Sequence, residues 1–147
     1  VWDKLILKIE NMTPSQIYKA HTNSLKSTGL SRQKVLYLKN LSIAFINKKL
    51  SVNSWNMMSD EEIIQELTKI KGIGRWTAEM FLIFNLCRAD IFPLDDIGMI
   101  KGLCKIYNLD YPLNKDKILK IGNKWKPYRS IATWYLWRSL DPIPVEY

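Results

Sequence analysis

The stretch that most constrains the fold is residues 70–78, IKGIGRWTA, where two glycines one residue apart interrupt a helical hydrophobic pattern. Helical spacing resumes directly after Gly74, so the segment predicts two helices joined by a very short turn. The first turn of the second helix leaves backbone N–H groups without helical acceptors, and such groups bind anions. A Gly-x-Gly is equally what an ordinary tight turn requires, because glycine adopts positive φ without penalty.

The charge of the chain favours a nucleic-acid phosphate as that anion. Its 147 residues include 22 Lys and Arg against 14 Asp and Glu, which gives a formal net charge of +8. A basic domain of this kind suggests nucleic acid first and an anionic membrane surface second. Because no run of 18 apolar residues occurs, the sequence predicts no transmembrane helix, and we expect no membrane partner.

The cysteine and histidine content argues against a metal centre. Cys87 and Cys104 are too few for a four-cysteine iron–sulfur cluster, and the single histidine, His21, lies far from both in sequence. We therefore expect no metal and no cofactor. Two reduced, mostly buried thiols are expected instead, which is typical of an intracellular protein.

Hydrophobic residues recur with helical spacing along the whole chain, and no segment shows convincing strand alternation. The length fits one domain, so the sequence predicts a single all-α domain over residues 1–147. Capping boxes at residues 13–16 and 59–62 mark two helix starts. The expected helices cover residues 1–10, 14–25, 32–48, 60–69, 75–86, 96–106, 115–123 and 127–140.

The acidic pair Asp95-Asp96 conflicts with a simple DNA-binding role. A negative charge near a phosphate backbone weakens binding unless it takes part in chemistry. Taken alone, an aspartate before a helix is most simply an N-cap. The order of hairpin and acid within a basic chain favours a catalytic role for one of the two carboxylates.

Three segments together resemble the helix-hairpin-helix-GPD base-excision DNA glycosylases. They are residues 69–78 (KIKGIGRWTA), residues 92–99 (FPLDDIGM), and residues 125–130 (WKPYRS) leading into 134–137 (WYLW). The last segment is similar to the final helix of the DNA-3-methyladenine glycosylase II branch. The resemblance covers residues 1–140 and implies a multi-helix glycosylase domain. It also implies that the family's upstream helices, which supply the wedge for base flipping, precede Val1 and are missing here.

By this resemblance, the chain is expected to be a monofunctional DNA N-glycosylase that excises alkylated purines such as 3-methyladenine. Its partner would be double-stranded DNA containing damaged bases, and it would act as a monomer, associated with DNA inside the cell. Asp96 matches the carboxylate that stabilises the oxocarbenium-like sugar and orients water. Bifunctional relatives carry a lysine nucleophile where this chain has Trp76, which leaves hydrolysis as the reaction. Asp95 is then expected to be an N-cap or a supporting residue.

The resemblance also assigns binding residues. Trp76, Met80 and Trp137 match the lining of the base pocket, where indole faces attract a cationic alkylated purine. Relatives carry an aromatic residue in place of Met80. Contacts to the DNA backbone are implied for five hairpin residues, namely Lys71, Gly72, Gly74, Arg75 and Thr77. Family hairpins also hold a monovalent cation through loop carbonyls, and we keep such a cation as an expectation here.

Two other functions stay open at this point. One is a catalytically silent helix-hairpin-helix module that only contacts phosphates, against which the charge of Asp96 argues. The other is a glycosylase of the same fold for another damaged base. Position 76 is a tryptophan and not a lysine, and the chain lacks a four-cysteine cluster. Both facts disfavour the endonuclease III-like branch of that fold. An Asp96→Asn variant separates the classes, because only an enzyme should lose base release.

Overall fold

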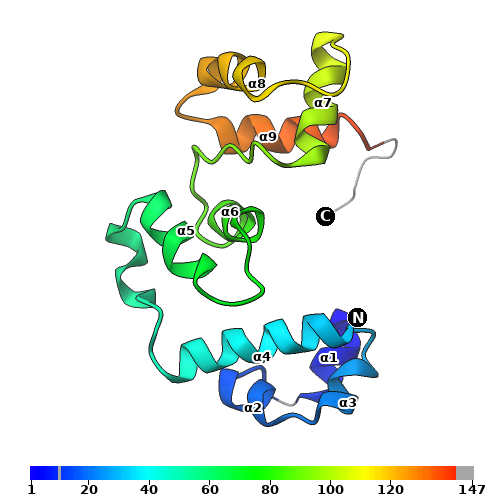
Figure 1. Ribbon diagram of the computed structural model, residues 1–147, viewed down its shortest axis with the longest axis vertical. Coiled ribbons are helices and arrows are strands. Elements are labelled where there is room, and N and C mark those ends of the chain that lie inside the picture. Colours follow the sequence, from blue (N-terminus) through cyan, green and yellow to red (C-terminus); the bar gives the residue numbers. More distant parts are fainter. Residues whose placement is uncertain (10, 142–147) are drawn as a thin grey trace. The chain divides into compact units, whose positions relative to one another are not determined.

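The computed structural model describes residues 1–9 and 11–141 (Figure 1). These residues form helices and loops with no strand among them, which confirms the all-α prediction. The chain divides into two compact units, Val1–Arg75 and Trp76–Tyr147. The prediction of a single domain stays a prediction. Among the described residues, no helix has the length and apolarity needed to cross a membrane.

The first unit is built on one long helix. Short helices α2 and α3 pack against α4, and α1 contacts α3, as Figure 1 shows for α2 below α4. Five buried apolar side chains form the core between them: Leu5, Ile9, Ile17, Leu25 and Val35. The elements are α1 (Trp2–Lys8), α2 (Pro14–Lys19), α3 (Thr22–Lys26), α4 (Arg32–Ile46), the 3-10 helix η1 (Val52–Met57) and α5 (Asp60–Thr68).

The prediction of a single helix over residues 14–25 is wrong. Ala20 and His21 have extended ψ angles of 137° and 136°, so the chain breaks there into α2 and α3. The two predicted capping boxes also differ. Ser59 and Glu62 form the reciprocal pair, whereas the Gln16 side chain accepts from the Asn11 N–H at 3.0 Å instead of returning to the N-cap.

The second unit packs α7 against α9. A glycine makes this crossing close, because a Cβ on Gly102 would lie 2.4 Å from the carbonyl oxygen of Leu136. Around the crossing lies a core of buried side chains: Phe92, Met99, Leu103, Ile118 and Leu136. The elements are α6 (Arg75–Phe84), whose first residue belongs to the first unit, α7 (Ile97–Tyr107), α8 (Lys115–Gly122), the 3-10 helix η2 (Asn123–Trp125) and α9 (Arg129–Arg138).

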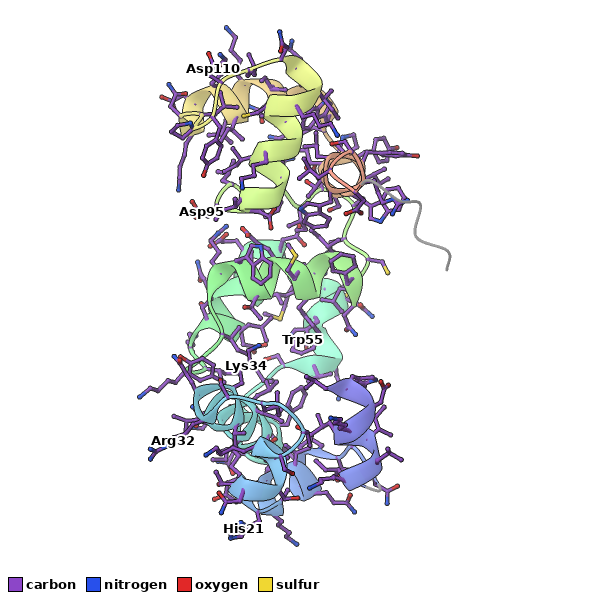
Figure 2. All side chains as sticks on the ribbon, turned by 90° about the vertical axis from the view of Figure 1, so that its right-hand side faces the viewer. His21, Arg32, Lys34, Trp55, Asp95 and Asp110 are labelled. Atoms are coloured by element: carbon purple, nitrogen blue, oxygen red, sulfur yellow. The ribbon has the colours of Figure 1, made fainter. Side chains whose placement is uncertain are left out.

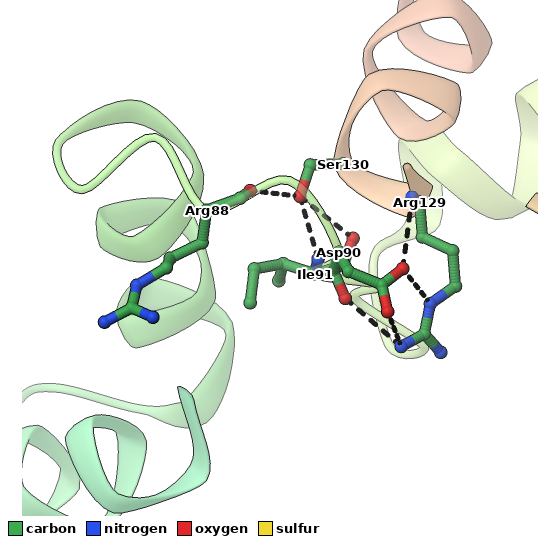
Figure 3. A network of polar contacts seen from close by, with 5 residues as sticks. All are labelled: Arg88, Asp90, Ile91, Arg129 and Ser130. Carbon is green, nitrogen blue, oxygen red and sulfur yellow. Dashed lines mark hydrogen bonds and ion pairs between the residues drawn. The ribbon is translucent and has the colours of Figure 1, made fainter. Parts of the chain in front are cut away.

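Polar contacts fasten the start of α9 to the loop after α6 (Figure 3). Arg129 donates from Nε to Asp90 Oδ1 at 2.7 Å and from Nη2 to Oδ2 at 2.8 Å. Ser130 Oγ accepts the Ile91 N–H at 2.8 Å and donates to the Arg88 carbonyl at 2.6 Å. The hydrogen bond from Arg129 holds the pKa of Asp90 below its ordinary value. This network fixes where α9 begins, and therefore where its aromatic side chains lie.

The cysteines agree only in part with the expectation of two buried thiols. Both are free, and Cys104 is buried in α7. Cys87 is exposed and lies in the loop after α6, with a φ of +51°.

Candidate active site

Asp96 is a buried carboxylate at the start of α7. It is 8% exposed, and its Oδ1 accepts the Met99 backbone N–H at 2.5 Å, which is an N-cap bond. The residue has an extended ψ of 112°, so the helix begins directly after it, at Ile97. The positive end of the helix dipole favours a negative charge at this position.

Asp95 was expected to be an N-cap or a supporting residue, and as an N-cap it is wrong. Its side chain is exposed and pairs with Lys115 at 2.6 Å, beside the first turn of α7 (Figure 2). Because the helix begins one residue later than expected, the capping position falls on Asp96. The residue assigned to chemistry and the residue that caps the helix are therefore the same.

Two tryptophans from other helices also donate to Asp96. Trp76, in the first turn of α6, donates its indole N–H to Oδ2 at 2.6 Å. Trp137, near the end of α9, donates to Oδ1 at 2.8 Å. A carboxylate offers about four acceptor positions. The contacts among the described residues fill two on Oδ1 and one on Oδ2, so the remaining position is on Oδ2.

The three residues predicted for a base pocket have different surroundings. Trp76 is half exposed, at 50%, and Met80 lies one turn later on α6, half-buried. Trp137 is half-buried and stacks on Phe84, with ring centroids 5.9 Å apart and an interplanar angle of 18°. A separate groove of about 510 Å³ is lined by Phe84 and other residues of α6, α9 and the loop after α6, but by none of the three predicted residues.

The glycine hairpin is a tight turn between α5 and α6. The Ile73 N–H donates to the Ile70 carbonyl at 3.0 Å, and Gly72 has a φ of +109° at the third position of this turn. A side chain there would also collide with Tyr37, whose Cγ lies 2.1 Å from the position of an ideal Cβ. Asn40 donates its side-chain amide to the Lys71 carbonyl at 3.0 Å.

Two residues of α4 thus brace the hairpin, and sequence reasoning missed both. Tyr37 and Asn40 lie three residues apart on one helix face, but more than thirty residues before the turn that they contact. Their helical spacing is visible in the sequence. Nothing in the sequence alone connects that face to the hairpin.

All five residues predicted to contact the DNA backbone are exposed: Lys71, Gly72, Gly74, Arg75 and Thr77. Among them, Arg75 forms a bidentate ion pair with Glu61, at 3.0 and 2.8 Å. The hydrogen bond from Arg75 lowers the pKa of Glu61. Thr77 lies in the first turn of α6, where backbone N–H groups have no helical acceptor. The predicted contact residues are thus accessible.

Within residues 1–9 and 11–141, no group of three or more His, Cys, Asp or Glu side chains could hold a metal ion. What the site itself presents is a carboxylate fixed by N–H donors, together with exposed indole surface.

A helical chain with a glycine hairpin and a capped, indole-bound aspartate defines the class to which the comparisons also point. Residues 1–127 match the family model described as "HhH-GPD superfamily base excision DNA repair protein", and the chain belongs to this superfamily. The resemblance inferred from the sequence is confirmed.

Similar proteins include two from Schizosaccharomyces pombe. The chain is 37% identical to the alkylbase DNA glycosidase-like protein mag2, over 86% of this chain and 60% of that protein. It is also 37% identical to DNA-3-methyladenine glycosylase 1, over 86% of this chain and 56% of that protein. A putative DNA-3-methyladenine glycosylase of Bacillus subtilis, YfjP, is 36% identical over 87% of this chain and 45% of its own length. The chain thus spans about half the length of these relatives.

Solved structures give the same fold. The S. pombe 3-methyladenine DNA glycosylase Mag1, in complex with abasic DNA, superposes with a TM-score of 0.80 at 37% identity, over 86% of this chain and 62% of Mag1. A DNA-3-methyladenine glycosidase from Bacillus halodurans superposes with a TM-score of 0.79 at 29% identity, over 94% of this chain and 64% of that one.

Proposed function

We propose that this chain carries the catalytic centre of a monofunctional DNA N-glycosylase that excises alkylated purines such as 3-methyladenine from double-stranded DNA. The observation that carries the proposal is the buried carboxylate of Asp96, held by the indoles of Trp76 and Trp137. Support for the substrate class comes from relatives named DNA-3-methyladenine glycosylases. Support for a DNA partner comes from the complex of Mag1 with abasic DNA, because an abasic site is what base release leaves.

Asp96 acts electrostatically in this proposal. Breaking the N-glycosidic bond develops positive charge on the deoxyribose, and a nearby carboxylate stabilises that charge. The N–H donors of Met99, Trp76 and Trp137 already fix both oxygens, so the carboxylate need not reorient as the charge forms. The remaining acceptor position on Oδ2 orients the water that attacks the sugar.

The leaving base requires less help than the sugar. An N3- or N7-alkylated purine is already positively charged, so it departs as a neutral base without a dedicated general acid. An exposed indole face at Trp76 attracts the charged ring by cation–π and stacking terms of about 0.5–2 kcal/mol. Met80 and Trp137 complete the proposed base pocket.

The hairpin supplies DNA affinity in this proposal. Backbone N–H groups at Gly72, Gly74 and Thr77 bind one phosphate, and the side chains of Lys71 and Arg75 add attraction that depends on salt. Arg75 exchanges Glu61 for the phosphate when DNA binds. The enzyme would work as a monomer without a cofactor, inside the cell at the genome, with hairpin carbonyls able to hold a monovalent cation.

The direct test measures release of 3-methyladenine and 7-methylguanine from methylated duplex DNA by the chain and its Asp96→Asn variant. Asparagine caps a helix about as well as aspartate, so α7 keeps its start while the negative charge is lost. The neighbouring Asp95→Asn variant is the matched control, because that carboxylate is exposed and pairs with Lys115. We expect release to vanish in the first variant and persist in the second. Persistent release by Asp96→Asn contradicts the proposal.

Whether the reaction is hydrolysis is tested separately. A lysine nucleophile would form a Schiff base that borohydride reduces to a stable protein–DNA adduct. Because Trp76 replaces that lysine, we expect borohydride to trap no adduct while base release proceeds. A trapped adduct would contradict the assignment as monofunctional.

A further inference from the structure

Gly98, the second residue of α7, lies between the catalytic carboxylate and one of its two indoles. A Cβ at this position would lie 3.1 Å from Trp137 Cδ1 and 3.3 Å from its Nε1. The same Cβ would lie 3.2 Å from Asp96 Oδ1. Both atoms of the 2.8 Å hydrogen bond from Trp137 to Asp96 are thus next to the space that a side chain would fill.

Helix formation does not explain a glycine at this position. Gly98 is within an α-helix, where alanine is preferred over glycine by up to about 1 kcal/mol. Its backbone is not in the left-handed region, unlike that of Gly72 and Gly29. The space occupied by the indole is the feature that distinguishes this position.

The indole has little room to move away from an added methyl group. Phe84 stacks on it. The residue before it, Leu136, contacts α7 so closely that a Cβ on Gly102 would lie 2.4 Å from its carbonyl oxygen. Retreat of Trp137 would therefore disturb either the ring stack or the helix crossing. Core groups packed this closely yield by small shifts at a cost.

We infer that Gly98 is a positioning residue: its missing side chain lets the Trp137 indole approach α7 and donate to Asp96 Oδ1. The expected effect of Gly98 on the rate rests on the proposed function, because Gly98 acts through Asp96. Its structural part, the placement of the indole, is independent of whether the chain is an enzyme.

The first experiment observes the indole directly by ¹H–¹⁵N spectroscopy of the chain. The Trp137 indole signal is identified as the one missing from Trp137→Phe. In Gly98→Ala we expect this signal to shift and its proton to exchange with water faster, while the Trp55 indole signal stays in place. Ile97→Ala is the control, since it removes an exposed side chain from the same turn and should leave the Trp137 signal unchanged. An unmoved Trp137 signal in Gly98→Ala overturns the inference.

The second experiment measures the saturating single-turnover rate of base release in a double-mutant cycle. We expect Gly98→Ala alone to slow release by about 10-fold, the lower end of what losing a charge-assisted hydrogen bond costs. In a Trp137→Phe background, Gly98→Ala should have no further effect, because the bond it disturbs is already absent. Equal slowing in both backgrounds overturns the inference.

Stability separates a positioning role from a general packing defect. If the added methyl group collides with the indole, removing the whole ring with Trp137→Ala removes the collision, so Gly98→Ala should not lower the Tm further in that background. A further fall in Tm there places the collision elsewhere and contradicts the inference. If the unmodified chain releases no base but the Trp137 signal still moves in Gly98→Ala, the proposed function fails and the inferred placement of the indole stands.

Discussion

Among residues 1–9 and 11–141, two carboxylates accept an indole N–H, and they differ in their other partners and in the exposure of the indole. In the first unit, Glu66 of α5 accepts Trp55 Nε1 at 2.6 Å through Oε2 and the Ser51 N–H at 3.0 Å through Oε1. In the second unit, Asp96 accepts two indoles and caps a helix. An indole bound to a carboxylate is therefore not by itself a sign of chemistry.

The two carboxylates differ in how exposed their indole donors are. Trp55 is buried, 5% exposed, so its bond to Glu66 fastens η1 to α5. Trp76 is half exposed, so the bond to Asp96 leaves indole surface beside the carboxylate accessible. The first arrangement stabilises a fold. The second combines a fixed charge with a surface on which a base can stack.

Among the changes to the indole donors, the largest effect is expected at Trp76. Trp76→Phe keeps an aromatic ring but removes the N–H that Oδ2 accepts, and a hydrogen bond to a charged group contributes roughly 1.5–3 kcal/mol. We expect the saturating single-turnover rate of base release to fall by about 10–100-fold, with DNA affinity little changed. Trp55→Phe makes the same atomic change at Glu66 and should leave the rate as it is. If Trp76→Phe and Trp55→Phe lowered the rate equally, the two indole–carboxylate pairs would not differ in function.

At Glu66 we expect the opposite result, a loss of stability without a loss of base release. Glu66→Gln leaves one of the two donors, the Trp55 indole or the Ser51 N–H, facing an amide NH₂. We expect the free energy of unfolding to fall by about 1–3 kcal/mol, as measured by urea denaturation, while the base-release rate per folded molecule persists. Unchanged stability would show that this pair does not hold η1 to α5.

The stability contributed by Glu66 and its two donors should also depend on pH. Burial by itself raises the pKa of Glu66, but hydrogen bonds from Trp55 and Ser51 outweigh it, so the pKa lies below its ordinary 4.5. A carboxyl group with a lowered folded-state pKa contributes stability that is complete above the unfolded pKa and lost as pH falls through the folded one. The stability difference between the chain and Glu66→Gln should therefore be full near neutrality and shrink below about pH 4.5. A difference that grows in acid would refute this assignment.

The smallest effect concerns the hairpin, which the proposal uses for binding only. Asn40→Ala removes the donor to the Lys71 carbonyl, a bond of about 0.5–1.5 kcal/mol. We expect DNA affinity to weaken by up to about 10-fold without a change in the saturating rate. Asn53→Ala, an exposed amide in η1, serves as control and should bind normally. A slower saturating rate in Asn40→Ala would show that the hairpin also serves the chemistry.

Local signals in the sequence predicted much of this fold. The Ser59 capping box, the glycine turn and the apolar spacing of α5 all act within a few residues, and their outcome is confirmed. The division of residues 14–25 was missed because two extended residues, Ala20 and His21, lie within otherwise helical spacing. Such a break depends on packing that a local pattern does not contain.

The site was predictable in part, and by a different route. Family resemblance selected Asp96, Trp76 and Trp137, and the structure joins these three side chains by hydrogen bonds. Their edge-on geometry was not foreseen, because sequence suggested stacking faces rather than N–H donors. The bracing of the hairpin by Tyr37 and Asn40, and the space kept by Gly98, depend on contacts between distant segments. Spacing along one helix cannot reveal such contacts.

In the proposed function, the charge of Asp96 performs the chemistry, whereas its place in the fold does not. The decisive experiment measures DNA affinity and the saturating rate of 3-methyladenine release together in Asp96→Asn and Glu66→Gln, which make the same change at the two indole-bound carboxylates. We expect Asp96→Asn to bind methylated DNA without releasing base, and Glu66→Gln to be less stable yet to release base normally. Base release by Asp96→Asn at the rate of the unmodified chain would show that the charge of Asp96 is not needed for the reaction.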